Sequence, residues 1–330
     1  MPAEVTVVGV GCELDRVFAG QRPVLPVPAL PRRDDLRDLF DAISGPVRAG
    51  HAVIVVVGDW VEEAVLDRLY LIRSLLQTHR VVIHITPLPP LAAGVLAAVI
   101  AALADEAVSP GVLAGALKRI SERIPVLAWT STVAGLRHPD ISVVDHARST
   151  LPWASFAVGF QPQPFVAPLR AKITEPLNLD PLPESQSLLM APSEKVEQDD
   201  LDLAVNVIIP ALGASQARQM EGSLHGPDWW GTRRVIEISG VPTDLHRLAV
   251  TTLPQETERC RWCDELIGAP PCPMCGDRGS MDRKKKRETG AYRTVKQQAA
   301  FTKHGETRAV SDGPGDGDPA ALTGSKGNEE

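Results

Sequence analysis

Four of the five cysteines lie close together near the end of the chain, in two Cys-x-x-Cys pairs. The first pair is Cys260 with Cys263, and the second is Cys272 with Cys275. Each pair places two thiolates on one tight turn, and two such pairs can complete a tetrahedral site of four sulfurs. We therefore predict a bound metal ion. A catalytic role for this metal is not expected, because four sulfur ligands leave no open coordination position.

The second cysteine pair stands in the sequence Cys-Pro-Met-Cys-Gly, ending at Gly276. This sequence resembles the Cys-Pro-x-Cys-Gly knuckle of zinc-ribbon modules. The first pair is a looser match, with Asp264 where the family often has glycine. The resemblance covers residues 256–279 and implies a small ribbon with a minimal β-hairpin and a structural Zn²⁺. Iron in a rubredoxin-like site uses the same ligands, so the sequence leaves zinc and iron open.

The first half of the chain alternates between short apolar runs and stretches of helical periodicity. The runs typical of buried strands are at residues 5–10, 52–57, 81–85, 126–129 and 141–144. Strands that alternate with helices in this way favour a parallel sheet covered on both faces. We predict an α/β fold, a Rossmann-like three-layer sandwich with a mostly parallel sheet, followed by a small C-terminal zinc ribbon and a disordered tail.

Changes in composition divide the chain. A proline-rich stretch interrupts the regular pattern, and the last part is polar and poor in large aliphatic residues. The predicted organisation is an α/β domain at 1–160, a Pro-rich linker or crossing at 161–184, an α/β extension or subdomain at 185–254, a zinc ribbon at 255–279 and a disordered tail at 280–330.

Small and polar residues follow several predicted strands. In open α/β sheets, ligands bind beyond the carboxyl ends of the strands. The candidate ligand-binding residues at these ends are Gly9, Gly11, Asp59, Thr130 and Ser131. The turn at Gly9 and Gly11 lacks the third glycine of the dinucleotide-binding fingerprint, because Leu14 occupies that position. A standard nucleotide-binding site is therefore not predicted. Asp59, with Glu62 three residues later, also suits a helix cap.

Three further residues near predicted strand ends have the types needed for nucleophilic catalysis. Cys12 would be the nucleophile, His146 the base and Asp145 the group that orients it. No nucleophile-elbow, Walker or metalloprotease motif accompanies them. A lone cysteine after a strand is more often a small buried hydrophobe. An α/β enzyme or small-ligand sensor that uses the strand-end crevice is therefore kept as an alternative function.

Tryptophan and arginine side chains near the ribbon suggest a contact surface, since these types dominate binding energies at interfaces. The candidates for partner binding are Trp262, Arg261, Trp229 and Trp230. The two adjacent tryptophans, Trp229 and Trp230, would equally well fill a gap in the packing against the sheet. Because the ribbon follows the last predicted strand, it is expected to project from the body. The predicted function is a non-catalytic cytoplasmic scaffold that binds a protein partner through the ribbon.

The distribution of charge and the length of the apolar runs bear on the partners and the location of the protein. The formal net charge is −7, yet the tail contains a basic run of Arg283, Lys284, Lys285, Lys286 and Arg287. This run keeps open a second alternative, a nucleic-acid-binding regulator that uses the ribbon and the tail. The longest apolar run, at 91–104, is too short to span a bilayer, and the N-terminus has no secretion pattern. We therefore expect a cytoplasmic protein without a membrane partner.

Overall fold

The structure is a computed structural model, and it describes residues 4–12, 24–27, 35–106, 108–136, 142–149, 151, 154–169, 186–214, 217–222 and 224–279. The chain divides into two units, residues 1–279 and 280–330, and every described residue belongs to the first. The predicted disordered tail and its basic run lie outside the described residues. Within the described part, no helix is both long enough and apolar enough to cross a membrane.

Four strands form a parallel sheet, called here the first sheet, in the order β2-β1-β3-β4. Its strands are β1 (Val5–Val10), β2 (Leu25–Val27), β3 (Ala52–Gly58) and β4 (Val81–Thr86). The central strand β3 is buried along its whole length. A continuous apolar run such as Ala-Val-Ile-Val-Val-Val-Gly forms this kind of strand because both of its faces are covered.

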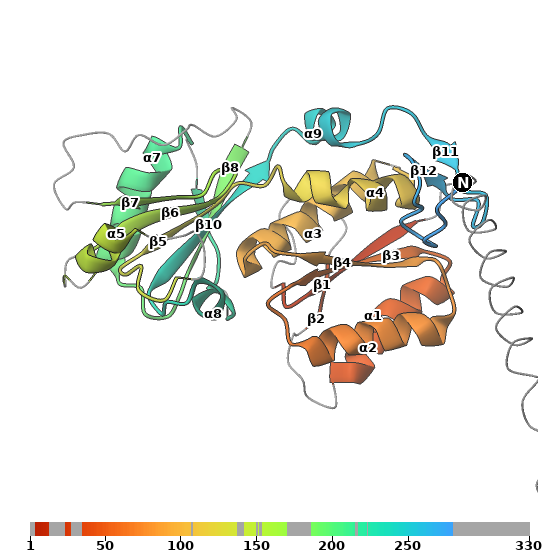
Figure 1. Ribbon diagram of the computed structural model, residues 1–330, viewed down its shortest axis with the longest axis horizontal. Helices are drawn as coiled ribbons and strands as arrows, with labels where there is room; N and C mark the ends of the chain where they lie inside the picture. Colours follow the sequence, from red (N-terminus) through yellow and green to blue (C-terminus); the bar gives the residue numbers. More distant parts are fainter. Residues whose placement is uncertain are drawn as a thin grey trace, which may run out of the picture. The chain divides into compact units, whose positions relative to one another are not determined.

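Helices cover both faces of the first sheet (Figure 1). On one side lie α1 (Asp35–Arg48) and α2 (Glu63–Leu76), and on the other lie α3 (Pro90–Asp105) and α4 (Pro110–Ser121). Two separate apolar clusters fill the space between the layers. The predicted α/β fold with a parallel sheet between two helical layers is confirmed for this part of the chain.

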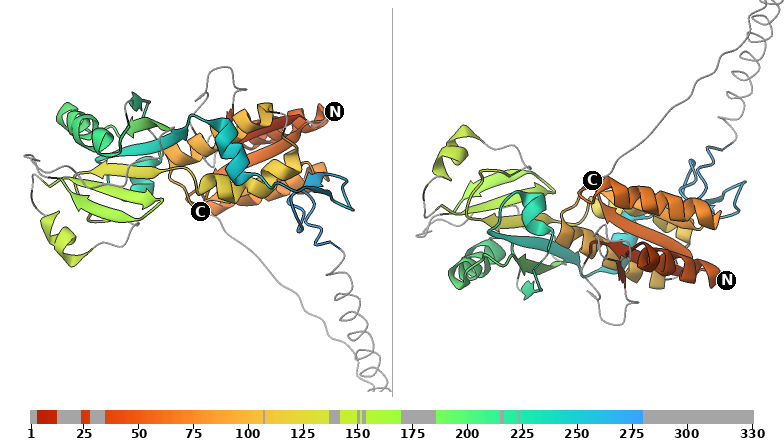
Figure 2. Two further views of the ribbon diagram at one scale, coloured as in Figure 1. Left: turned by 90° about the horizontal axis from the view of Figure 1, so that it is seen from above. Right: turned by 90° about the horizontal axis from the view of Figure 1, so that it is seen from below.

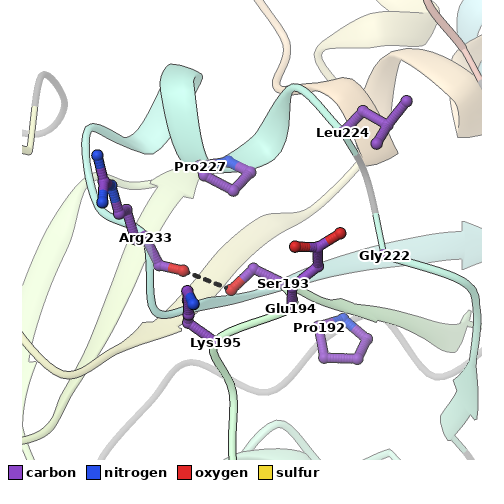
Figure 3. Close-up of a pocket in the computed structure, with 8 residues that line it drawn as sticks. All are labelled: Pro192, Ser193, Glu194, Lys195, Gly222, Leu224, Pro227 and Arg233. Atoms are coloured by element: carbon purple, nitrogen blue, oxygen red, sulfur yellow. Dashed lines mark hydrogen bonds between the residues drawn. The ribbon is translucent and has the colours of Figure 1, made fainter.

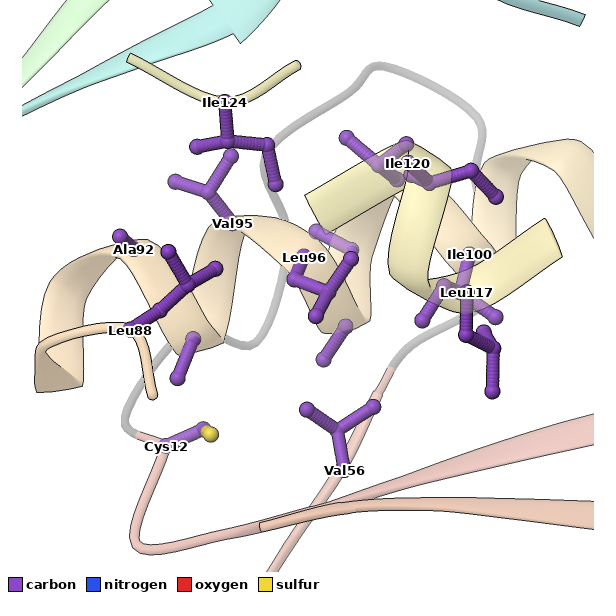
Figure 4. Packing of buried hydrophobic residues seen from close by; sticks show 14 of the residues in the cluster. Cys12, Val56, Leu88, Ala92, Val95, Leu96, Ile100, Leu117, Ile120 and Ile124 are labelled. Carbon is purple, nitrogen blue, oxygen red and sulfur yellow. The ribbon is translucent and has the colours of Figure 1, made fainter. Parts of the chain in front are cut away.

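The helix α3 has no polar face. Every residue from Pro90 to Leu103 is buried. One side of the helix packs on β1 and β3, and another packs on β10 (Val235–Pro242) of a second sheet. Figure 4 shows Leu96 of this helix between Val56 of β3 and the α4 side chain of Ile120. A helix that is apolar all round is buried on all sides, and here it joins the cores of the two sheets.

The second sheet has six strands in the order β7-β6-β5-β10-β8-β9. The strands before β10 in the chain are β5 (Val126–Thr130), β6 (Phe156–Gln161), β7 (Phe165–Pro168), β8 (Gln186–Pro192) and β9 (Ala217–Gln219). All neighbours are antiparallel except β8 and β9. The run at 126–129 is therefore a strand, as predicted, but it lies in this sheet and not in the parallel one. Periodicity could not separate the two cases, because β5 is buried on both faces.

The remaining helices are short. They are α5 (Val143–Arg148), α6 (Gln198–Leu203), the π-helix η1 (Ala204–Ile208), α7 (Ile209–Ala211), α8 (Gly226–Trp230) and α9 (Leu245–Thr252). The strand predicted at 141–144 is wrong, because α5 begins at Val143, directly after Ser142. Ser142 is the N-cap, and its hydroxyl accepts a hydrogen bond of 3.1 Å from the Asp145 backbone N–H. Capping by serine competes successfully with strand propensity over so short a segment.

The ribbon contains the hairpin of β11 (Glu258–Arg259) and β12 (Leu266–Ile267). It lies beside α4 in Figures 1 and 2, where it is drawn in blue. Four of its side chains, those of Cys260, Ile267, Cys272 and Met274, are buried in the same apolar cluster as α3 and α4. The expectation that the ribbon projects from the body is therefore wrong, because its own apolar residues cover the outer side of α4.

Candidate functional site

The four clustered cysteines have the geometry of a tetrahedral metal site. Their sulfur atoms all lie within 4.8 Å of one another. The Sγ atoms of Cys260 and Cys275 are 3.6 Å apart, and those of Cys263 and Cys272 are 3.7 Å apart. A tetrahedral ion with metal–sulfur bonds of about 2.3 Å requires sulfur separations of about 3.8 Å. The predicted ligand set is thus brought together, and two of its sulfur pairs are close to the spacing that one ion needs.

The two knuckles of the ribbon repeat one backbone pattern. The N–H of the first cysteine of each pair, Cys260 or Cys272, donates to the carbonyl five residues later, at 2.8 Å in both knuckles. Its carbonyl accepts from the N–H four residues later, at 2.9 Å in both. That fourth residue is Asp264 or Gly276, and both have left-handed backbones with φ of 60° and 78°. Aspartate is one of the few non-glycine residues that adopts this conformation readily, which explains why the looser first knuckle still closes.

The thiols of the cluster differ in acidity. Burial raises the pKa of Cys260, but the backbone N–H groups of Cys263 and Trp262 outweigh it and lower the pKa to about 7. Burial raises the pKa of Cys263 above its ordinary value of 9.0. A cation must therefore displace the proton of Cys263 when it binds, as thiolate sites generally require.

Side-chain hydrogen bonds tie the ribbon to two helices. The Ser109 hydroxyl, at the start of α4, donates to Glu265 Oε1 at 2.7 Å and to the Leu266 carbonyl at 3.1 Å. Arg73 of α2 donates to the Met274 carbonyl at 3.1 Å. These contacts, together with the shared apolar cluster, make the metal centre part of the packing around the first sheet.

The predicted partner-binding residues do not form one surface. Trp262 and Arg261 are exposed on the first knuckle, and Trp262 retains 74% of its accessible surface. Trp229 and Trp230 are buried, and Trp229 packs edge-on against Phe160 with ring centroids 5.3 Å apart. For these two tryptophans the interpretation as contact residues is corrected: they fill the space between α8 and the second sheet, where large apolar rings are stabilised by burial.

The predicted ligand-binding residues are divided between the two sheets. Gly9 lies within β1 of the first sheet, and Gly11 and Asp59 follow β1 and β3. Thr130 and Ser131 lie at the end of β5 in the second sheet. The Thr130 hydroxyl is buried and donates to the Thr132 carbonyl at 2.8 Å. The expectation that all five line one crevice is therefore wrong, because it assumed a single continuous sheet.

At the carboxyl end of β3, the space is occupied by the Trp60 side chain. The indole of Trp60 donates to the Leu88 carbonyl at 3.2 Å, and its ring centroid lies 4.9 Å from that of His225. A Cβ atom placed on Gly58 would lie only 2.0 Å from the Trp60 indole nitrogen. The glycine at the end of β3 thus makes room for this ring and not for a ligand phosphate.

The predicted nucleophile and its partners are not assembled. Cys12 is 2% exposed and belongs to the core between the first sheet and α3, as Figure 4 shows. Asp145 and His146 are on α5, which lies beside the outer strands of the second sheet (Figures 1 and 2). The catalytic interpretation of Cys12 is corrected, since a thiol packed in an apolar core has no path to a substrate.

A pocket that sequence reasoning missed lies next to α8 and has a volume of about 640 Å³. Figure 3 shows its lining: Pro192, Ser193, Glu194, Lys195, Gly222, Leu224, Pro227 and Arg233. These residues come from three segments, namely the end of β8 with the turn after it, the stretch that leads into α8 with the start of that helix, and the turn before β10. No local motif marks them, so only the fold could reveal the pocket, which we call the α8 pocket.

One buried hydroxyl fixes the floor of the α8 pocket. Ser193 Oγ donates to the Arg233 carbonyl at 2.8 Å and accepts from the Val235 N–H at 3.1 Å. The same serine's backbone N–H donates to the Val235 carbonyl at 2.9 Å. The residues beyond Ser193 and before Val235 are therefore held side by side. Lys195 and Arg233 thereby both belong to the lining of this pocket.

No protein-family model and no curated protein sequence matches the chain. Several solved structures are similar to the chain in fold. A fatty-acid-binding DegV family protein from Thermus thermophilus is 12% identical, with a TM-score of 0.49 over 72% of this chain and 99% of that one. A DegV family protein from Eubacterium eligens, loaded with heptadecanoic acid, is 11% identical, with a TM-score of 0.47 over 73% and 100%. The fatty acid kinase B3 protein of Streptococcus pneumoniae, loaded with linoleic acid, is 9% identical, with a TM-score of 0.44 over 73% and 99%.

The packing of the ribbon corrects the predicted function. Several of the similar solved structures are described as fatty-acid-binding proteins. The ribbon itself packs on α4, and two of the four proposed anchors are buried. The prediction of a scaffold that binds its partners through a projecting ribbon is therefore wrong.

Proposed function

We propose that the protein binds a small amphipathic carboxylate of the fatty-acid class in the α8 pocket. The observation that supports this proposal is the pairing of two cationic side chains with an exposed apolar one around a single hollow. Lys195 and Arg233 are exposed on the pocket, and Leu224 there retains 70% of its accessible surface. The volume of about 640 Å³ falls within the range of roughly 300–1,000 Å³ typical of small-molecule sites.

The charges of the pocket favour one end of such a ligand. A guanidinium and an ammonium together can bind one carboxylate, and the guanidinium can do so with two parallel hydrogen bonds. Glu194 is the one acidic residue of the lining. Its carboxylate repels a second negative charge, so a monocarboxylate is preferred over a dicarboxylate.

The apolar lining favours the other end. Leu224, Pro192 and Pro227 present aliphatic surface to the pocket. Each methylene of an acyl chain that leaves water against such surface contributes about 0.8 kcal/mol. A ligand with a chain of several methylenes would also cover Leu224, whose exposure is otherwise unfavourable.

The test is a calorimetric titration of the delipidated full chain with decanoate, with decanol as the uncharged comparison. We expect decanoate to bind and decanol to bind at least tenfold more weakly, because a charge-assisted hydrogen bond contributes about 1.5–3 kcal/mol. Lys195→Ala and Arg233→Ala should each weaken decanoate binding about tenfold, and Leu224→Ser should weaken both ligands. Lys118→Ala, which removes an exposed lysine on α4, is the control. No decanoate binding, or unchanged binding in the Arg233 variant, would refute the proposal.

For the cysteine cluster, we infer that the resident ion is Zn²⁺ and that its role is structural. Four thiolates at tetrahedral spacing suit zinc, and they leave no position for a substrate or water. The ion would hold the two knuckles together, which the hairpin of two-residue strands cannot do alone. Elemental analysis of protein purified without added metal should give about one zinc per chain. Iron instead of zinc, accompanied by visible thiolate-to-iron absorption, would contradict the assignment.

A further inference from the structure

Three polar side chains meet at the amino end of the first sheet. Thr6 Oγ1 lies 3.1 Å from His51 Nδ1, and His51 Nε2 lies 2.8 Å from Glu4 Oε2. Glu4 and Thr6 are two residues apart along β1, so their side chains lie on one face of the strand. The register pairs Val5 with Ala52, which places His51 beside Glu4 on that same face. The three residues form a hydrogen-bonded chain of hydroxyl, imidazole and carboxylate.

The backbone around these residues is firmly held. The His51 N–H donates to the Pro46 carbonyl at 3.0 Å, which closes the turn after α1. Gly50, with φ of 90°, allows that turn, and its carbonyl accepts a hydrogen bond from Arg80. The Ala52 N–H donates to the Glu4 carbonyl at 2.7 Å. The backbone on both sides of the His51 side chain is therefore held by hydrogen bonds.

A second pocket of about 330 Å³ opens at Thr6 and His51. Most of its lining is aliphatic: Val5, Val7, Leu25, Gly45, Pro46, Ala49 and Ala101. The pocket lies at the amino end of β1, opposite to the strand-end region that Trp60 fills. It is separate from the α8 pocket, with which it shares no residue.

The arrangement has the roles that nucleophilic catalysis requires. With the imidazole neutral, Thr6 O–H donates to Nδ1, and Nε2–H donates to the Glu4 carboxylate. The carboxylate then selects the tautomer in which Nδ1 is free to accept the hydroxyl proton. A nucleophile within hydrogen-bond reach of a base that a third group orients is the signature of covalent acyl transfer.

We propose that Thr6 and His51 are the catalytic residues of an acyl-transfer site, with Glu4 as the positioning residue. Thr6 Oγ1 attacks the carbonyl carbon of a short-chain activated ester, its proton passes to His51 Nδ1, and the carbon–oxygen bond to the leaving group breaks. The leaving group takes the proton from Nδ1. Water then attacks the Thr6 ester and gives its proton to Nδ1. The ester bond breaks, and Thr6 recovers that proton as the carboxylic acid departs. The small aliphatic pocket selects short acyl chains.

The substrate used to test the site is p-nitrophenyl butyrate, with the full-length protein. We expect hydrolysis well above the buffer rate, and at least a 100-fold lower kcat for Thr6→Val and His51→Gln, as loss of a base or nucleophile typically produces. Thr6→Ser keeps the hydroxyl and should retain activity. Glu4→Gln should lower kcat and leave KM unchanged, which a purely structural role would not do. His246→Gln, which removes an exposed histidine on α9, should change nothing.

A covalent probe gives a second, independent readout. A fluorophosphonate should form a bond from Thr6 Oγ1 to phosphorus as fluoride leaves and the hydroxyl proton passes to His51. Peptide mass spectrometry should find the label on Thr6 in the wild type and not in His51→Gln, with melting temperature as the check on folding. Hydrolysis at the buffer rate, label on another residue, or full activity in folded Thr6→Val would each overturn the proposal and leave the hydrogen-bonded chain as a tie between β1 and β3.

Discussion

The hydroxyl of Ser109 and the carboxylate of Glu265 form a hydrogen bond of 2.7 Å between the first turn of α4 and the ribbon. The same carboxylate oxygen accepts from the Gly111 N–H at 3.4 Å. A negative charge there compensates the free N–H groups and the positive end of the helix dipole. One ribbon residue thus does for α4 what an N-cap side chain within the helix would do, and the Ser109 side chain makes no such bond.

Replacing Glu265 by alanine should destabilise the protein. Among the described residues, its carboxylate is the only side chain outside α4 that accepts a hydrogen bond from the first N–H groups of this helix. We expect a fall of about 1 kcal/mol in the free energy of unfolding, as for a lost helix cap. Urea denaturation followed by circular dichroism measures it. Glu258→Ala, on the exposed strand β11, is the matched control and should stay within about 0.5 kcal/mol of wild type. Equal effects of the two substitutions would contradict the capping role.

Two glycines of α4 should respond oppositely to alanine. A Cβ atom at Gly111 would lie 2.5 Å from the Leu266 carbonyl oxygen, whereas one at Gly115 would meet only the Pro273 ring at 3.8 Å. We expect Gly111→Ala to cost about 1–3 kcal/mol through forced separation of α4 from the ribbon. Gly115→Ala should add up to about 1 kcal/mol, because alanine loses less backbone entropy in a helix. Thermal melts of both variants compare the two directly.

Removal of the metal should weaken more than the ribbon. Cys272 and Met274 are buried in the same cluster as α3 and α4, so the packing around the first sheet depends on the closed knuckles. We expect chelation, or Cys272→Ser, to remove the ion and to lower the single melting transition of the described unit. Cys12→Ser, at the cysteine outside the cluster, should retain the metal. An unchanged melting temperature after verified metal loss would show that the packing around the first sheet does not depend on the closed knuckles.

The stability of the protein should depend on pH through His84 of β4. Burial lowers the pKa of this imidazole below its usual 6.5, and its Nε2 has no hydrogen-bond partner within the described part of the chain. The unfolded chain therefore takes up a proton at a higher pH than the folded one. The free energy of unfolding should fall as the pH decreases from about 6.5 toward the folded pKa. His84→Leu should flatten this part of the profile, and His246→Leu, at an exposed site, should not.

Local signals in the sequence predicted what local geometry decides. The spacing of Cys260, Cys263, Cys272 and Cys275 alone indicated the metal cluster, because each knuckle closes within six residues. The continuous apolar runs predicted β1, β3 and β4, since a strand covered on both faces needs no polar alternation. Even the departure at Asp264 has a local explanation in its tolerance of a left-handed backbone.

Features that depend on long-range pairing could not be predicted in this way. β5 pairs with β10, whose residues come more than a hundred positions later, and nothing in either run names its partner. The contact of Thr6 with His51 could not be predicted for the same reason, because it exists only where β1 lies beside β3. The α8 pocket is formed by three separate segments of the chain, so no single stretch of sequence predicts it. Trp60 was likewise unmarked, although it decides that the strand-end region is filled.

The burial of α3 has a consequence for how the chain is made. This helix packs on β1 and β3, which precede it, but also on β10, which begins at Val235 and leaves the ribosome long after residue 105. During that interval its second side has no cover and exposes a run of alanine, valine and leucine to solvent or to other nascent chains. Such a surface is a binding site for general chaperones and a starting point for aggregation. Slow translation between α3 and β10 would therefore reduce the yield of folded protein more than a delay anywhere after Pro242.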